Sequence, residues 1–438
     1  MNDPNLAATL EQTIRAHRPL EINAPWADEI VFPYYDGLSI RNLAHTVVQW
    51  LVDRHDHTDA QIGPAPLDGQ IWERWRGQVR RVVLFITDGL GWQLLQALRE
   101  QDAELAQIVA DLVGEGLLVP ITSIAPSTTA AALPSIWTGA SPAATGMVGT
   151  QFFLREFGVL ANLLHYWPVS GKHRPEVLED WGLNFENFLP RLTLGQVLAS
   201  WGVESYLLQQ KGLLGTGLSR LMHRGIAHQR LYFGYTDLWV ALRELLHETR
   251  RKRCFISAYW NAVDSLSHLH GRDAEHTTTE IRRQLADLRD VLGAEGVRDG
   301  HTLFILVADH GHTAIREYVV AEEHPLLMDA LRMAPAGDAR LAHLYLRHGT
   351  RDDVVAYLCE NLGEKLACFL PEEALAAGLF GPEPPYAETP ARLGDLTVLA
   401  REGVALTVRA PNGKFASRSR HAGMSAREMF VPLLMRTL

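Results

Sequence analysis

The chain has 438 residues, enough for two or three ordinary domains or for one large α/β domain with insertions. Hydrophobic residues make up 47% and charged residues 21%, which supports a sizeable core and excludes disorder or low-complexity function for most of the chain. The 51 acidic and 41 basic residues give a net charge of −10, which argues against a basic scaffold for nucleic acid, and the pI near 6.0 suits a cytoplasmic protein.

Neither the N-terminus nor the cysteines indicate secretion. Residues 1–22 predict a short amphipathic helix and not a signal peptide, because no basic segment precedes an apolar one. No run of 18 apolar residues predicts a transmembrane helix. Cys254, Cys359 and Cys368 are too few and too scattered for a disulfide framework or a thiolate zinc site. We expect them to be buried or inert thiols in a reducing compartment.

Short apolar runs alternate with helical stretches, and this pattern predicts a parallel sheet covered by helices. The clearest strands are residues 81–87 (RVVLFIT), 254–260 (CFISAYW) and 302–308 (TLFILVA). Their nearly uninterrupted apolar character is typical of strands buried on both faces. Weaker strands are predicted at 117–124, 205–209 and 396–400, and helices at 92–99, 194–201, 237–251 and 277–292.

Two stretches interrupt this alternation. Residues 150–191 are rich in aromatic and loop residues, and residues 324–393 contain the proline-rich segment GPEPPYAETP. We interpret the chain as a single α/β domain over 1–438, with a cap insertion at 150–191 and a second insertion or small subdomain at 324–393. Long surface loops are the alternative for both stretches.

Each of the three clearest strands is followed by a carboxylate: Asp88, Asp264 and Asp309. Ligands bind at the carboxyl ends of the strands in an open parallel sheet, so these residues can converge on one edge. A single acidic residue after a strand is commonly a helix N-cap. Three such strands, two of them followed by histidines, favour a shared site.

The histidines near these carboxylates indicate metal binding. Asp264 and His268 are four residues apart, which places both on one face of a helix. Asp309 and His310 form a second pair, and His421 lies far downstream. Such donors suit Zn²⁺, with Mn²⁺ or Fe as alternatives. Two such clusters side by side would form a two-metal site for phosphoryl displacement, with the ions ~3.5–4 Å apart.

A cluster of hydroxyl residues precedes small residues that suit the first turn of a helix, in the segment 125–139 (APSTTAAALPSIWTG). A hydroxyl at a helix N-terminus lies at the positive end of the helix dipole and can attack phosphorus once it is ionised. An ordinary N-cap Ser or Thr is the alternative interpretation.

In their joint order these motifs resemble the alkaline phosphatase superfamily, and within it the type I phosphodiesterase/nucleotide pyrophosphatase branch. The order is Asp-Gly at 88–89, Pro-Ser-Thr-Thr at 126–129, Ser-Ile-Trp-Thr-Gly at 135–139, Asp-x-x-x-His at 264–268, Asp-His-Gly at 309–311 and the late His421. The resemblance spans residues 82–432. It implies a doubly wound, mostly parallel α/β sheet sandwiched by helices, with cap insertions.

The resemblance also implies a function: hydrolysis of phosphodiester or pyrophosphate bonds in a small phosphorylated substrate such as a nucleotide, with two divalent metal ions, zinc being the first choice. Thr129 would be the nucleophile, and Thr128 is the neighbouring alternative. The implied ligands are Asp88, Thr129, Asp309 and His310 for one metal, and Asp264, His268 and His421 for the other.

The chain departs from the family pattern at several positions. Ala132 stands where the branch usually has an asparagine that contacts a phosphoryl oxygen, and Thr128 where it often has a lysine. Ala130 follows Thr129, where the monoesterase branch has an arginine, so we expect diesters or pyrophosphates to be cleaved better than monoesters. His312 has no assigned role and is either a substrate contact or a structural turn residue.

The cap insertion offers candidate substrate contacts. Its aromatic residues are expected to stack on the second ester group, and a basic residue could replace the missing arginine. The aromatic candidates are Phe152, Phe153, Tyr166 and Trp167, and the basic candidates are Lys172 and Arg174.

Other functions are also considered. A phosphomonoesterase or phosphomutase of the same superfamily is the first alternative, and a non-catalytic member that binds a phosphorylated ligand is the second. A dinucleotide-binding oxidoreductase would rest on Asp-Gly-Leu-Gly-Trp at 88–92, which lacks the Gly-x-Gly-x-x-Gly spacing. A sulfatase is disfavoured because no Cys/Ser-x-Pro-x-Arg signature surrounds Thr129.

Overall fold

A seven-stranded sheet forms the centre of the computed structural model, which describes residues 4–52, 63, 65–409 and 417–438. The strand order is β2-β18-β9-β1-β8-β6-β7. Only β18 runs antiparallel to its neighbours, so the mostly parallel α/β sheet expected from the sequence is confirmed. The strands are β1 Arg81–Thr87, β2 Leu117–Thr122, β6 Glu204–Gln210, β7 His228–Tyr232, β8 Cys254–Trp260, β9 Thr302–Val307 and β18 Phe430–Thr437.

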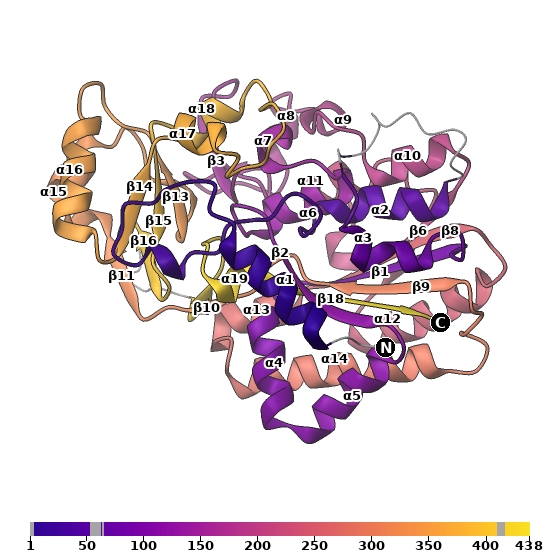
Figure 1. Cartoon of the computed structure of the whole chain (residues 1–438). Coiled ribbons are helices and arrows are strands. Elements are labelled where there is room, and N and C mark those ends of the chain that lie inside the picture. The colour runs from indigo at the N-terminus through magenta and orange to yellow at the C-terminus, as the bar shows by residue number, and fades with distance from the viewer. Residues whose placement is uncertain (1–3, 53–62, 64, 410–416) are drawn as a thin grey trace.

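Helices cover both faces of this sheet (Figure 1). One layer contains α2 Asn42–Leu51, α6 Thr129–Thr138, α10 Leu194–Ser200 and α11 Gly217–Met222. The other contains α4 Trp92–Gln101, α5 Ala103–Val113, α12 Tyr235–Glu248 and α14 Glu275–Gly293. Every residue of β1 and β9 is buried, which explains why these strands are continuous apolar runs and do not alternate.

The two predicted insertions contribute strands to one second sheet, of order β14-β15-β13-β12-β3-β4-β5. Its strands are β3 Gln151–Leu154, β4 Val159–Asn162, β5 Trp167–Pro168, β12 Ala336–Asp338, β13 Leu341–Leu344, β14 Leu366–Phe369 and β15 Leu396–Ala400. Gly337 pairs with Gln151 and joins the two stretches. The predicted strand at 396–400 therefore belongs to this sheet and not to the central one.

The C-terminal half of this sheet has its own apolar core, which includes Leu327, Leu344, Leu358 and Val398. The helices α15 Pro325–Ala330 and α16 Arg351–Leu362 supply part of it. These elements form the left side of the molecule in Figure 1. The segment 324–393 is thus packed structure and not a long surface loop.

The remaining α-helices and strands lie outside the two large sheets and the helix layers named above. They are α1 Pro4–Ala16, α3 Gly69–Trp72, α7 Pro142–Thr145, α8 Val177–Asp180, α9 Phe185–Phe188, α13 Ala262–His270, α17 Pro371–Ala376, α18 Thr389–Leu393, α19 Ala426–Met429, and the strand pairs β10 Thr313–Ala314 with β17 Ser419–Arg420 and β11 Glu317–Val320 with β16 Val404–Thr407. Sequence patterns did not predict β18, whose apolar run is interrupted by Pro432 and Arg436. Pro432 lies opposite Pro120, so at this pair neither residue has an N–H to donate to the other strand.

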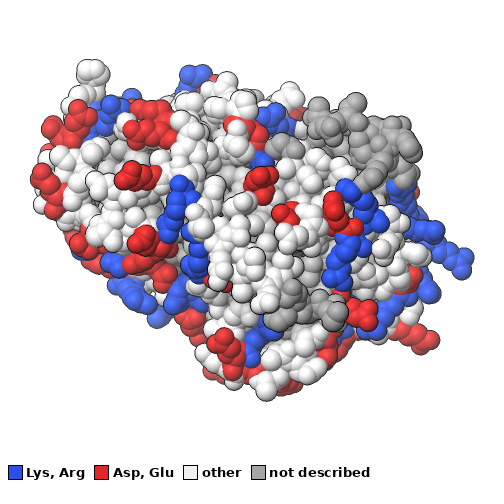
Figure 2. Space-filling model, viewed as in Figure 1, with Lys and Arg blue, Asp and Glu red and all other residues white. Residues whose placement is uncertain are grey.

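The three cysteines differ in exposure. Cys254 is buried, Cys359 is exposed and Cys368 lies between these extremes, and all three thiols are free. Within the described ranges, no helix combines the length and the apolar character needed to cross a membrane. Acidic and basic side chains are interspersed on the face shown in Figure 2.

Candidate functional site

The ends of β1, β8 and β9 place three carboxylates side by side. β1 pairs in parallel with both β8 and β9, so the residues that follow these strands emerge at one edge. The Asp88 backbone N–H donates to the Trp260 carbonyl at 2.9 Å, and the Asp264 N–H donates to the Asp88 carbonyl at 3.1 Å. The Gly89 N–H donates to Asp309 Oδ1 at 3.1 Å. The first two bonds fix the backbone positions from which the side chains of Asp88 and Asp264 extend, and the third holds the Asp309 carboxylate directly.

Asp88, Asp309 and His310 form a first group, whose potential ligand atoms all lie within 4.8 Å of one another. His310 Nε2 lies 3.4 Å from Asp88 Oδ1 and 3.4 Å from Asp309 Oδ2. Both oxygens are buried, and no residue in the described part of the chain donates a hydrogen bond to them. Burial, and then the charges of Asp309 and Asp264, raise the pKa of Asp88 well above its usual value. Two buried carboxylates with unsatisfied oxygens are a chemical fit for a cation.

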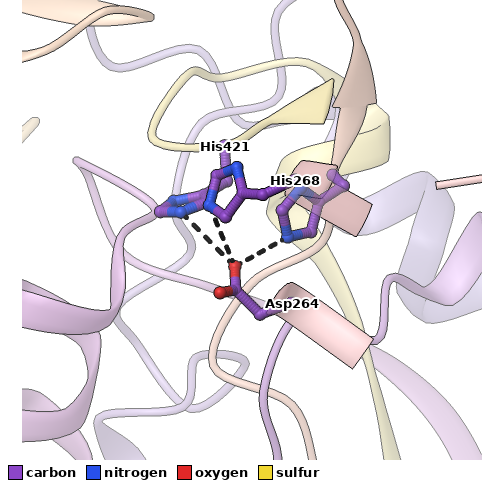
Figure 3. A group of neighbouring side chains, drawn as sticks. Asp264, His268 and His421 are labelled. Carbon is purple, nitrogen blue, oxygen red and sulfur yellow. Dashed lines mark hydrogen bonds and ion pairs between the residues drawn. The ribbon is translucent and has the colours of Figure 1, made fainter. Parts of the chain in front are cut away.

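Asp264, His268, His312 and His421 form a second group, again with their potential ligand atoms within 4.8 Å of one another. Figure 3 shows the imidazoles of His268 and His421 pointing toward the Asp264 carboxylate. The Asp264 Oδ1 atom lies 3.3 Å from His268 Nε2, 2.9 Å from His312 Nε2 and 3.6 Å from His421 Nε2. Asp264 and His268 come from α13, one helical turn apart.

Backbone carbonyls fix which nitrogen of the ligand imidazoles carries the proton. His268 Nδ1 lies 2.8 Å from the Ser419 carbonyl, and His421 Nδ1 lies 3.2 Å from the Ser127 carbonyl. A carbonyl oxygen only accepts, so each Nδ1 donates, and the Nε2 of each ring carries a lone pair whenever that ring is neutral. A lone pair facing a carboxylate is repulsive unless a cation or proton lies between them. The second group therefore also fits a metal ion.

Burial opposes protonation of His268, but its hydrogen bond to Asp264 outweighs this and raises the pKa of His268, so without a metal ion a proton on Nε2 relieves the repulsion. Burial opposes ionisation of Asp264, but hydrogen bonds from His268 and His312 outweigh it and hold its pKa well below the usual value. Burial, and then the neighbouring His310, lower the pKa of His421 well below its usual value. His421 is thus neutral, the form in which imidazole binds metals.

His312 was singled out in the sequence without a role, and the structure places it against Asp264. Burial lowers its pKa to about 4, and its Nδ1 atom is buried without a partner among the described residues. Its position two residues after His310, at the end of β9, was the available signal. It is either a fourth donor of the second group or a residue that holds the Asp264 carboxylate in place.

The two candidate nucleophiles face different neighbours. Thr129 is the first residue of α6, and its Oγ1 lies 3.0 Å from His310 Nε2. Thr128 is the N-cap, and its Oγ1 lies 3.0 Å from the hydroxyl of Thr150. The hydroxyl of Thr129 is therefore directed at the first group of potential ligands, whereas that of Thr128 is directed at the second sheet.

The two groups lie side by side and border one cavity. The rings of His310 and His421 stack with their centroids 3.8 Å apart. Asp88, Thr129 and Asp264 line a cavity of about 620 Å³. Such neighbouring donor groups can hold two cations beside a hydroxyl, the arrangement that phosphoryl transfer uses.

Sequence reasoning missed two residues at this site. The Tyr259 hydroxyl donates to Asp88 Oδ2, which orients the carboxylate. Asn261 lines the cavity beside Asp264. Both lie at the carboxyl end of β8, so their position after a predicted central strand was the only signal.

The cap insertion contributes different residues from those expected. Phe152 and Tyr166 are fully buried, Tyr166 against Phe185. Leu164, His165, Pro175 and Glu176 line the cavity instead. The expected basic residues Lys172 and Arg174 are exposed, and Arg174 bonds to Asp180. Phe152 and Tyr166 are part of the main hydrophobic core, so their rings are not available to a substrate.

Comparisons with known proteins identify the family of the chain and solved structures with its fold. Residues 82–424 match the model of a family described as type I phosphodiesterase / nucleotide pyrophosphatase. No curated protein sequence matches the chain.

Solved structures share the fold. Murine ectonucleotide pyrophosphatase / phosphodiesterase 5 is 15% identical with a TM-score of 0.60, covering 82% of this chain and 88% of its own. The same murine protein in complex with AMP has a TM-score of 0.59 at 15% identity, covering 81% of this chain and 87% of that one. Phosphonoacetate hydrolase from Sinorhizobium meliloti 1021, in complex with phosphonoformate, is 17% identical with a TM-score of 0.59, covering 82% of this chain and 91% of that one.

Proposed function

Because the chain belongs to the type I phosphodiesterase / nucleotide pyrophosphatase family of hydrolases, we propose that it cleaves phosphodiester or pyrophosphate bonds with Thr129 as the nucleophile. One observation carries the proposal. The Thr129 hydroxyl lies at the N-terminus of α6, 3.0 Å from His310 Nε2, between a cavity and two groups of potential metal ligands.

The chain would hold two divalent cations, with zinc as the first choice and manganese or iron as alternatives. Unsatisfied carboxylate oxygens and converging imidazole lone pairs support this assignment. A bound divalent cation supplies positive charge that lowers the pKa of a hydroxyl and stabilises negative charge on phosphoryl oxygens. The proposed ligands are Asp88, Thr129, Asp309 and His310 for one ion and Asp264, His268 and His421 for the other, with His312 beside Asp264.

The residues of the chain then have defined tasks. The Thr129 hydroxyl gives up its proton to solvent, its oxygen forms a bond to phosphorus, and the P–O bond opposite it breaks, so that the alcohol or phosphate leaves and takes up a proton. The N-terminus of α6 stabilises negative charge at this position, because its first N–H groups point toward it. Water subsequently hydrolyses the phosphothreonine and restores the hydroxyl. Tyr259 holds the carboxylate of Asp88 in place through its hydroxyl.

The turn after the nucleophile supports a preference for diesters. Ala130, Ala131 and Ala132 are fully buried and provide no side-chain donor. A dianionic monoester would lack the forked guanidinium that binds two of its oxygens. A phosphodiester carries one negative charge less than a monoester dianion, so it needs fewer positively charged partners in the site. We expect kcat/KM for a nitrophenyl diester to exceed that of the matched monoester, and a tenfold preference for the monoester, ~1.4 kcal/mol, would instead support a phosphomonoesterase.

Metal removal and a pair of threonine variants test the proposal. Chelation should abolish hydrolysis of bis(p-nitrophenyl) phosphate, and Zn²⁺ or Mn²⁺ should restore it. Thr129→Ala should lower kcat on the order of 10³-fold or more with metals still bound, whereas Thr128→Ala, the matched control, should retain most activity. Full activity of verified metal-free protein would refute the proposal. An active Thr129→Ala with an inactive Thr128→Ala would assign the nucleophile to Thr128.

A further inference from the structure

We propose that the cavity beside Thr129 binds the organic group of the substrate, and that this group is uncharged and mainly apolar. The preferred substrate would then be a monoanionic phosphodiester of such an alcohol and not a nucleoside polyphosphate. This inference rests on the proposed function and narrows its substrate class.

The cavity is continuous with the reacting hydroxyl. Leu133 and Trp137 follow Thr129 by four and eight residues on α6, so all three lie on one face of that helix and all three line the cavity. Leu207 of β6 and Met222 of α11 close the opposite side. A group esterified to a phosphorus atom at Thr129 therefore has an apolar space next to it.

The charges around this cavity are unfavourable for a second anion. Among the described lining residues there is no lysine or arginine, and Glu176 is an acidic lining residue that is not among the proposed metal ligands. The Glu176 carboxylate accepts from the Gly217 N–H at 3.1 Å, which holds it at the wall. Burial lowers the pKa of His223 to about 3, so its imidazole is neutral and supplies no positive charge. Away from the proposed metal ions, an additional phosphate in this space would find no lysine or arginine among the described lining residues.

The size and shape of the cavity indicate a ring-sized group. Its volume of about 620 Å³ lies within the usual ~300–1,000 Å³ of small-molecule sites. The rings of Trp137 and His223 meet edge to face with centroids 4.8 Å apart and form one firm wall. A methyl group would leave most of this apolar space to water, whereas an aryl group would displace that water and bind more tightly.

A series of p-nitrophenyl phosphodiesters with one leaving group isolates this effect. The second alcohol is methyl, phenyl or 4-carboxyphenyl, so the last two differ by a single negative charge. For metal-loaded protein, kcat/KM should rise at least tenfold from methyl to phenyl and fall at least tenfold from phenyl to 4-carboxyphenyl. Equal values for methyl and phenyl, or a preference for the 4-carboxyphenyl ester or for ATP, would overturn the inference.

A charge placed in the cavity should change this selectivity. Leu213 lines the cavity from the short 3₁₀ helix Lys211–Leu213 after β6, whereas Leu231, on edge strand β7, is 38% exposed and outside the lining. Leu213→Arg should lower the phenyl-to-methyl ratio and raise the 4-carboxyphenyl-to-phenyl ratio, each at least fivefold. Leu231→Arg should leave both ratios at their wild-type values. Unchanged ratios in Leu213→Arg, or equal shifts in both variants, would contradict the assignment.

The same series of esters distinguishes a failure of the proposed function from a failure of the inference about the cavity. If metal-loaded protein hydrolyses the methyl and phenyl esters equally well, the proposed function stands and only the inference about the cavity fails. If it hydrolyses none of the three esters, the proposed function fails and the inference fails with it.

Discussion

Replacing Arg340 by methionine should destabilise the protein strongly, because Arg340 forms a fully buried ion pair with Glu428. Both side chains have no exposed surface, and two parallel bonds of 2.9 and 2.7 Å join them. Glu428 also accepts from the Gly423 N–H at 2.9 Å and from the Ser425 hydroxyl at 2.6 Å. Arg340 thereby connects the β12–β13 hairpin of the second sheet to the segment that carries His421.

The expected magnitude follows from what the substitution leaves behind. Arg340→Met removes one partner and leaves the Glu428 charge buried, which typically costs ~3–5 kcal/mol. The double variant Arg340→Met/Glu428→Gln removes the uncompensated charge but keeps an acceptor for Gly423 and Ser425. It should therefore be more stable than Arg340→Met alone by at least ~1 kcal/mol.

The effect should also depend on pH. Burial opposes ionisation of Glu428, but the charge and hydrogen bonds of Arg340 outweigh it and lower its pKa. A lowered folded-state pKa contributes stability that is present above the unfolded-state value and is lost as the pH falls through the folded-state value. Without Arg340 the pKa of Glu428 should rise, and Glu428 then takes up a proton in the folded state. The difference in the free energy of unfolding between the wild-type protein and Arg340→Met should therefore become smaller as the pH is lowered.

Urea unfolding followed by tryptophan fluorescence measures these free energies. Arg332→Met is the control, since Arg332 pairs with Asp395 at 2.8 Å but the two side chains are 53% and 41% exposed. An exposed pair of this kind contributes ~0–1 kcal/mol. The reasoning is refuted if Arg340→Met costs no more than this control, or if the double variant is as unstable as the single one.

Three further outcomes concern the candidate metal site. His421→Ala should lower the metal content by about one ion per chain, measured by elemental analysis, with unchanged unfolding of the metal-free protein, because this ligand comes from a late loop. Tyr259→Phe should weaken metal binding ~10–100-fold in competition titrations, because it removes the hydroxyl that orients Asp88. In the metal-free protein the pKa of Asp88 is raised, so the folded state holds a proton that the unfolded state releases. The stability of the metal-free protein should therefore fall as the pH rises toward neutrality, and its affinity for metal should rise over the same range. Melting temperatures and metal affinities that do not change with pH would contradict this prediction.

The sequence by itself determined the innermost strands of the central sheet and the family. Runs such as 81–87 and 302–308 are continuous apolar segments because their strands are buried on both faces, and this property is local. Asp88 and Asp309 follow these strands directly, so their convergence at one edge follows from strand direction alone. The order of the motifs then sufficed for the family resemblance, which the match over 82–424 confirms.

Only the tertiary structure decided which distant groups meet. His312 contacts Asp264 across 48 positions, and Arg340 contacts Glu428 across 88. The two stretches expected to be separate insertions share one sheet through the pairing of Gly337 with Gln151. Periodicity and spacing describe neighbours along the chain. Long-range pairing, shared burial and the cavity beside Thr129 depend on how separate segments pack, and no local pattern encodes that packing.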